Sequence, residues 1–122
     1  VLAPVRLTAE LLPQLRTARG RVINISSDAA EAAYPGWGGY GASKAALDQV
    51  SAVLAEEELD LRVYAVDPGD MNTAMHQAAF PGEDISDRAD PGGVAAAMQP
   101  LFDGALPSGR YRATELPAAV PS

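Results

Sequence analysis

The sequence predicts an α/β fold, a parallel sheet with helices on both of its faces. Two β-branched apolar segments, residues 21–26 and 61–66, flank a long stretch of helical periodicity at residues 39–58. A strand–helix–strand unit with a crossover of this length joins parallel strands in the right-handed sense. The first segment is apolar on both sides at its centre, Val22-Ile23, which is typical of a strand inside a parallel sheet.

A helix is predicted before the first strand, over residues 3–18. Its apolar side chains recur every four residues, at Leu7, Leu11 and Leu15, and form one stripe. Pro13 lies deep in this pattern, where a missing backbone hydrogen bond is expected to bend the helix. Gly20 is expected to end it.

The remaining elements follow from composition and periodicity. Residues 28–38 are rich in Ala, Gly and Pro and are predicted to form a loop. The long helix should bury one face, made of Leu47, Val50 and Leu54. A short helix is possible at residues 72–79. A further helix is expected at 92–102 and a last short strand at 108–113.

Composition limits the classes of function. The chain has 122 residues, enough for one small domain or part of one. Its net charge of −7 argues against nucleic acid or an anionic membrane as a partner. No cysteine is present, which excludes disulfides and thiolate metal sites. No apolar run approaches the roughly 18 residues of a membrane span. No signal peptide is apparent either, so a soluble cytoplasmic protein is expected.

Three residues carry the candidate chemistry: Ser27, Tyr40 and Lys44. Tyr40 and Lys44 are four residues apart, so on a helix they share one face. A phenol that exchanges a proton near neutral pH needs a lowered pKa, and a neighbouring ammonium lowers it by favouring the phenolate. Ser27 ends a strand, and its hydroxyl is placed to donate a hydrogen bond to a substrate oxygen. Taken alone, the Tyr–Lys spacing also suits an exposed tyrosine and a solvated lysine.

The context of these residues resembles the short-chain dehydrogenase/reductase family. In that family a catalytic serine ends a strand thirteen residues before the tyrosine of a Tyr-x-Ala-Ser-Lys segment, and Ser27 stands thirteen residues before Tyr40 here. The resemblance implies a Rossmann-type doubly wound sheet and NAD- or NADP-dependent interconversion of a carbonyl and an alcohol. Tyr40 would be the general acid/base, Lys44 would assist it and bind the nicotinamide ribose, and Ser27 would polarise the substrate oxygen.

A second stretch, residues 66–73, extends the resemblance. The family carries Pro-Gly after this strand and a threonine four positions beyond the glycine, which Pro68, Gly69 and Thr73 match. There the segment touches the nicotinamide carboxamide, through backbone near Met71 and the threonine hydroxyl. The resemblance therefore assigns cofactor binding to Tyr40, Lys44, Pro68, Gly69, Met71 and Thr73. Without it, the same stretch indicates a turn that ends a strand.

Three other side chains are candidates for the wall of a substrate pocket, although packing in the core would explain each equally well: Trp37, Met75 and Phe80. The family's helices beside the serine strand often pack across a dimer axis, and the segments 3–18 and 39–58 have a suitable length. A homo-oligomer, either a dimer or a tetramer, is therefore expected, with a small carbonyl or alcohol as substrate.

The resemblance covers only the second half of the family's pattern. Residues 1–116 correspond to the C-terminal catalytic half, residues 117–122 are expected to form a flexible tail, and the Gly-rich pyrophosphate site has no counterpart. The 122 residues alone are therefore expected neither to bind the cofactor nor to turn over a carbonyl substrate. The alternative is an inactive truncated remnant that serves as an oligomerisation or binding module. The first strand would leave one edge unpaired, which invites self-association.

Two further patterns are weaker. Gly36, Gly38 and Gly41 spell a dinucleotide fingerprint, but that fingerprint must follow a strand directly, and nine residues separate Ser26 from Gly36. These glycines are better explained by a close approach to substrate or cofactor.

The single histidine, His76, has no cysteine or second histidine with which to bind a metal. A serine hydrolase is disfavoured because no Gly-x-Ser-x-Gly segment occurs.

Overall fold

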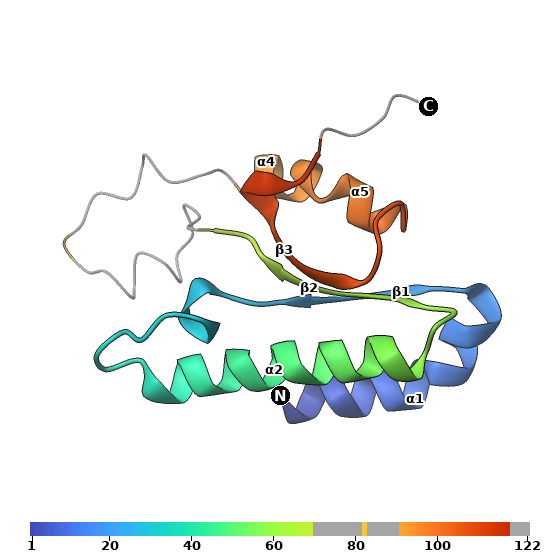
Figure 1. Cartoon of the computed structure of the whole chain (residues 1–122), viewed down its shortest axis with the longest axis horizontal. Helices are drawn as coiled ribbons and strands as arrows, with labels where there is room; N and C mark the ends of the chain where they lie inside the picture. Colours follow the sequence, from blue (N-terminus) through green and yellow to red (C-terminus); the bar gives the residue numbers. More distant parts are fainter. Residues whose placement is uncertain (70–81, 83–90, 118–122) are drawn as a thin grey trace.

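The computed structural model describes residues 1–69, residue 82 and residues 91–117. Three parallel strands form one sheet in the order β1-β2-β3, with helices on both faces (Figure 1). In chain order the elements are α1 (Leu2–Ala18), β1 (Arg21–Ile25), the 3₁₀ turn η1 (Asp28–Ala30), α2 (Gly38–Glu57), β2 (Arg62–Asp67), α4 (Pro91–Ala97), α5 (Gln99–Phe102), β3 (Gly109–Arg112) and the 3₁₀ turn η2 (Ala113–Glu115). The predicted α/β class and parallel sheet are confirmed.

Strand β2 is the centre of the sheet. It pairs with β1 in the register Val22↔Val63 and with β3 in the register Val66↔Tyr111. Helices α1 and α2 lie against one face of the sheet, whereas α4 and α5 lie against the other (Figure 1). Because α2 links β1 to β2 and both strands run in the same direction, their carboxyl ends meet at one edge of the sheet.

The core follows from the alternation of side chains along β2. Tyr64 and Val66 are fully buried against Met98, Leu101 and Ala113, on the side of α4 and α5. Val63 and Ala65 alternate with them along the strand, so they face the opposite side of the sheet, and they are buried as well. The Tyr64 hydroxyl donates to the carbonyl of Leu106 at 2.7 Å, so the buried phenol keeps a hydrogen-bond partner.

Strand β1 and helix α1 are much less buried than β2. The prediction that β1 is buried within the sheet is wrong for the described residues, because its side chains are half-buried and Ile25 is 44% exposed. In this part of the chain β1 pairs with β2 alone, so its other edge is open. No residue of α1 is buried, and Leu7 and Leu11 of its predicted apolar stripe are 59% and 43% exposed.

The end of α1 differs from the prediction in one respect. The residue in the left-handed conformation is Arg19, with φ 50° and ψ 51°, rather than Gly20. Gly20 has another role, because a Cβ atom there would stand 2.9 Å from the Leu15 side chain. Its small size therefore lets the chain turn tightly against α1 as it enters β1.

Two predicted segments differ internally from what the sequence indicated. The single helix expected at 92–102 is two short helices, α4 and α5, separated at Met98. The loop predicted at 28–38 contains η1, for which the Ser27 hydroxyl provides the N-cap by accepting the Ala29 N–H. The helix considered at 72–79 lies outside the described residues.

An ion pair joins α1 to the end of α2. The Arg16 Nε atom lies 3.0 and 3.1 Å from the two carboxylate oxygens of Glu58, and its Nη2 atom contacts the same group. This hydrogen-bonded guanidinium holds the pKa of Glu58 below its ordinary value. Apolar burial contributes little to the attachment of α1, because none of its residues is buried. The ion pair therefore helps to hold α1 on the rest of the molecule.

We predict that Leu101→Ala destabilises the protein by about 2–5 kcal/mol, because the Leu101 side chain is fully buried and its truncation leaves a cavity in the core. The free energy of unfolding in urea measures this loss. Leu59→Ala is the matched control, since Leu59 is 77% exposed and should change stability by less than about 0.5 kcal/mol. Equal effects at the two positions would contradict this assignment of the core.

We predict that Glu58 makes stability depend on pH in acid. Its lowered folded pKa means that the unfolded chain binds the proton first, so the stabilisation is present above the ordinary glutamate pKa of 4.5 and is lost as pH falls through the lower folded value. The difference in thermal midpoint between wild type and Glu58→Gln should therefore shrink as pH falls from 7 to 3. Glu56→Gln, two residues earlier on the exposed surface, should show no such trend.

Candidate active site

The three predicted catalytic residues come from the end of β1 and the start of α2. Ser27 follows β1 directly and has extended backbone angles, φ −157° and ψ 157°. Its Oγ accepts the Ala29 N–H at 3.1 Å and donates to Asp28 Oδ1 at 3.2 Å. The hydroxyl is thereby held at the carboxyl edge of the sheet, which is where open α/β sheets bind ligands.

Tyr40 and Lys44 lie in the first turns of α2, on one face of the helix. The Lys44 Nζ atom is 5.7 Å from the centroid of the Tyr40 ring. The Trp37 ring meets the Tyr40 ring edge-on, with centroids 5.5 Å apart. Tyr40 as a whole is 38% exposed to solvent. The structure therefore brings the predicted phenol and ammonium together.

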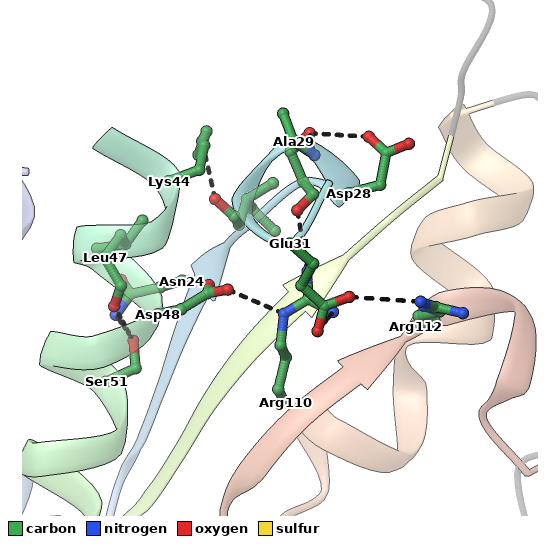
Figure 2. Close-up of polar contacts among 12 residues, drawn as sticks. Asn24, Asp28, Ala29, Glu31, Lys44, Leu47, Asp48, Ser51, Arg110 and Arg112 are labelled. Atoms are coloured by element: carbon green, nitrogen blue, oxygen red, sulfur yellow. Dashed lines mark hydrogen bonds and ion pairs between the residues drawn. The ribbon is translucent and has the colours of Figure 1, made fainter. Parts of the chain in front are cut away.

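Lys44 also connects α2 to β1. Its Nζ donates to the backbone carbonyl of Ile25 at 2.8 Å (Figure 2). Alternate residues of a parallel strand turn their backbone groups toward opposite neighbours. Because the Ser26 N–H bonds to Val66 of β2, the carbonyl of Ile25 faces the open edge of β1. Lys44 thus contacts the strand two residues before Ser27, which joins the three predicted residues into one cluster.

A buried polar pair fixes α2 on β1 behind this cluster. Asn24 Nδ2 donates to Ser51 Oγ at 2.9 Å, and the Ser51 hydroxyl donates to the Leu47 carbonyl at 2.8 Å (Figure 2). Ser51 is 3% exposed. The buried Ser51 hydroxyl is therefore satisfied by the half-buried Asn24 amide and the Leu47 carbonyl, and the register of the helix on the strand is set by a directional contact.

The glycines of the loop before α2 have a structural role in the described residues. A Cβ atom on Gly41 would stand 2.8 Å from the Ala29 carbonyl oxygen, so the first turn of α2 lies directly on η1. Gly36 has φ 84°, a conformation that favours glycine. The close approach at Gly41 is to the chain's own backbone. The predicted approach of this loop to substrate or cofactor stays a prediction.

A residue that sequence reasoning missed completes the cluster. Arg110 of β3 donates to Asp48 of α2 and to the backbone carbonyl of Ser27, each at 2.9 Å, and pairs with Glu31 at 3.3 Å (Figure 2). Burial acts to lower the pKa of Arg110, but the Asp48 hydrogen bond and the neighbouring carboxylates outweigh it and raise the pKa. The sequence hints at this contact only through Asp48, a carboxylate one helical turn after Lys44 that could pair with a basic residue.

A cleft of about 430 Å³ opens at the carboxyl ends of the three strands. Its lining residues come from η1 and its neighbours, from the turn after β2, and from β3 and η2: Asp28, Glu31, Ala32, Tyr34, Asp67, Gly69, Arg112 and Thr114. Asp67 Oδ1 accepts the Gly69 N–H at 2.9 Å, and Gly69 has φ 78°. Pro68 is half-buried and Gly69 lines the cleft, and their predicted contact with the cofactor stays a prediction. The predicted contacts Met71 and Thr73, with His76, Met75 and Phe80, lie outside the described residues.

Metal sites and membrane spans are both missing from the described part of the chain. Residues 1–69 and 91–117 contain no group of three or more His, Asp or Glu side chains arranged to hold a metal ion. Among the helices described there, none is both long and apolar enough to cross a membrane.

Residues 1–84 match the family described as short chain dehydrogenase. The chain belongs to the short-chain dehydrogenase family. An uncharacterized oxidoreductase of Saccharomyces cerevisiae is 33% identical over 116 residues, which cover 95% of this chain and 43% of that protein. Sepiapterin reductase of Xenopus laevis is 44% identical over 82 residues, which cover 65% of this chain and 31% of that protein.

Solved structures of short-chain dehydrogenases have the same fold. One from Shigella flexneri, complexed with NADP, superposes with a TM-score of 0.83 at 33% identity, over 93% of this chain and 50% of that one. Another, from Escherichia coli and complexed with NADPH, has a TM-score of 0.80 at 33% identity, over 93% and 49% of the two chains. The chain thus spans about half the length of these short-chain dehydrogenases.

We predict that Ser51→Ala loosens the attachment of α2 to β1. It removes the partner of the half-buried Asn24 amide, so the free energy of unfolding should fall by about 1–3 kcal/mol. Ser43→Ala is the matched control, because Ser43 also donates to the carbonyl four residues earlier but is exposed. It should change stability by less than about 0.5 kcal/mol. A Ser51 variant as stable as the Ser43 variant would contradict a role for this contact.

Proposed function

We propose that the protein is an NAD(P)-dependent oxidoreductase that interconverts a carbonyl and an alcohol by hydride transfer. The observation that carries this proposal is the position of Lys44 beside Tyr40 in the first turns of α2, bonded to the end of the strand that leads into Ser27. Membership of the short-chain dehydrogenase family supports it. The similar structures complexed with NADP and NADPH favour a nicotinamide cofactor.

The donors at this site fit the nicotinamide end of such a cofactor. An ammonium group has three N–H donors, and the Ile25 carbonyl accepts one from Lys44. Two N–H donors remain for the ribose hydroxyls beside the exposed Tyr40. Pro68 and Gly69 follow β2 at the same edge of the sheet and would contact the nicotinamide side, together with Met71 and Thr73. The cofactor, when bound, supplies the hydride.

Each catalytic side chain has a distinct role in the proposed reaction. Tyr40 gives a proton to the carbonyl oxygen during reduction and takes it back during oxidation, as a general acid/base. Lys44 places a positive charge one helical turn away, which stabilises negative charge as it develops on the phenol oxygen. Ser27 donates a hydrogen bond to the substrate oxygen, where charge builds up in the transition state. In that step the Ser27 hydroxyl exchanges Asp28 for substrate.

We also propose that the protein acts as a homo-oligomer through α1 and α2. Apolar side chains stay exposed on both helices, including Val5, Leu7, Leu11 and Val53. A groove of about 330 Å³ runs between the two helices and is lined mostly by apolar residues. Exposed apolar patches of this kind indicate protein–protein contact. The acidic net charge of −7 supports neither nucleic acid nor an anionic membrane as the partner.

We predict that Tyr40→Phe lowers turnover by about 10²- to 10⁴-fold, because it keeps the ring but removes the acid. The assay follows oxidation of NADPH and NADH by their loss of absorbance in the full-length protein, with a panel of ketones and aldehydes. Tyr111→Phe is the control, since the Tyr111 hydroxyl donates to the Pro107 carbonyl away from the cluster. It should retain wild-type turnover.

The outcome separates the two functions that the sequence suggested. A Tyr40→Phe variant with more than about a third of wild-type turnover would rule out Tyr40 as the acid. A wild-type protein with no turnover on any carbonyl and no heat of NADPH or NADH binding would favour the alternative, an inactive module for oligomerisation or binding.

A further inference from the structure

Arg110 lies where three elements of the cluster meet. Its Nε donates to Asp48 Oδ2 of α2 at 2.9 Å, and its Nη2 donates to the Ser27 carbonyl at 2.9 Å. Its Nη1 pairs with Glu31 Oε1 at 3.3 Å. All three nitrogens of one guanidinium are therefore used, one on α2 and two on the residues at the two ends of η1, and Figure 2 shows the side chain between α2 and η1.

Two of these partners are connected to candidate catalytic groups, and the third lies at the end of η1. Asp48 follows Lys44 and Tyr40 at four-residue spacing, so all three lie along one stripe of α2. The Ser27 carbonyl belongs to the residue whose hydroxyl would bind the substrate oxygen, and it also accepts the Ala30 N–H at 3.1 Å. Glu31 is the residue that ends η1. Arg110 therefore connects the helix of Tyr40 and Lys44 to the backbone of Ser27.

The environment makes this contact a strong one. The side chains of Arg110 and Asp48 are only 22% and 18% exposed, so water screens the pair less than it screens a surface ion pair. Arg112, two residues along the same strand, also pairs with Glu31, but at 3.4 Å and with 52% exposure. Exposed pairs of that kind contribute little. A guanidinium is also planar and rigid, so it fixes the relative directions of its partners.

We infer that Arg110 is a positioning residue, which holds Ser27 in a fixed place relative to Tyr40 and Lys44. This inference rests on the proposed oxidoreductase function. Arg110 touches neither the phenol nor the ammonium, and it acts through Asp48 and the Ser27 peptide. Removing it should free η1 to shift on α2, and displacements of about 1 Å at a reacting centre can cost about 10²-fold in rate.

The test compares Arg110→Gln with Arg16→Gln in the full-length protein. Arg16 also pairs with a carboxylate at α2, that of Glu58, the residue that follows the last turn of the helix. Arg110→Gln should lower kcat by about 10- to 100-fold while KM for the carbonyl changes little, because a transition-state interaction is lost. Arg16→Gln should lower stability without lowering kcat at temperatures where it is folded.

Two further measurements separate positioning from charge and from stability. Arg110→Lys keeps the charge but cannot reach three partners at once, so it should recover thermal stability and leave kcat low. Amide hydrogen exchange at Ala29, which bonds to Ser27 Oγ, should accelerate in Arg110→Gln and not in Arg16→Gln. Full recovery of kcat in the Lys variant would overturn the inference, as would unchanged exchange at Ala29.

The same experiments distinguish failure of the inference from failure of the proposed function. If Tyr40→Phe abolishes turnover and Arg110→Gln keeps it, the reaction stands and the positioning role falls. If the wild-type protein turns over no carbonyl substrate, the proposed function falls and the positioning role falls with it, whatever the exchange at Ala29 shows.

Discussion

The central constraint in this structure is that β2 is paired on both edges and covered on both faces. Tyr64 and Val66 are fully buried on one face, and Val63 and Ala65 are buried on the other. Backbone groups inside such a layer must bond to neighbouring strands, and both neighbours run parallel to β2, since helical crossovers separate it from β1 and from β3. The carboxyl ends of β1, β2 and β3 are thereby brought to one edge, where Ser27, Gly69 and Arg112 all lie.

The candidate site depends on that arrangement but is held by different forces. Tyr40, Lys44 and Ser27 are not in the apolar core, and their positions come from directional contacts. Lys44 bonds to the Ile25 carbonyl, Ser27 caps η1, and Arg110 joins Ser27 to α2. The hydrogen bonds from Lys44 and Arg110 carry a charged donor, which makes them stronger than neutral ones. The sheet thus supplies the frame, and a few polar contacts set the geometry within it.

Local patterns explain why much of the fold could be predicted. The β-branched strand pattern and the helical periodicity that follows it lie close together in the sequence. The strand–helix–strand unit, and the helix face shared by Tyr40 and Lys44, could therefore be predicted from local patterns alone. Burial was less predictable for β1, because the exposure of Ile25 depends on what pairs with the open edge. The break between α4 and α5 at Met98 does have a local signal, Pro100 in the first turn of α5, which the prediction of a single helix did not use. Arg110 was missed because it is 62 residues from Asp48 and 83 from Ser27.

Lys44 donates to a backbone carbonyl at the open edge of β1, so its position also bears on how that edge can pair. The Ile25 carbonyl that accepts the Lys44 ammonium faces away from β2, and such groups at a free edge are available to another strand. A carbonyl oxygen has two lone pairs, so a strand that paired there would share this acceptor with Lys44 rather than leave it unchanged. The position of the Lys44 ammonium beside Tyr40 therefore depends on whether another strand pairs with β1. The Ile25 peptide group takes part both in the geometry of the proposed site and in any further strand pairing of the sheet.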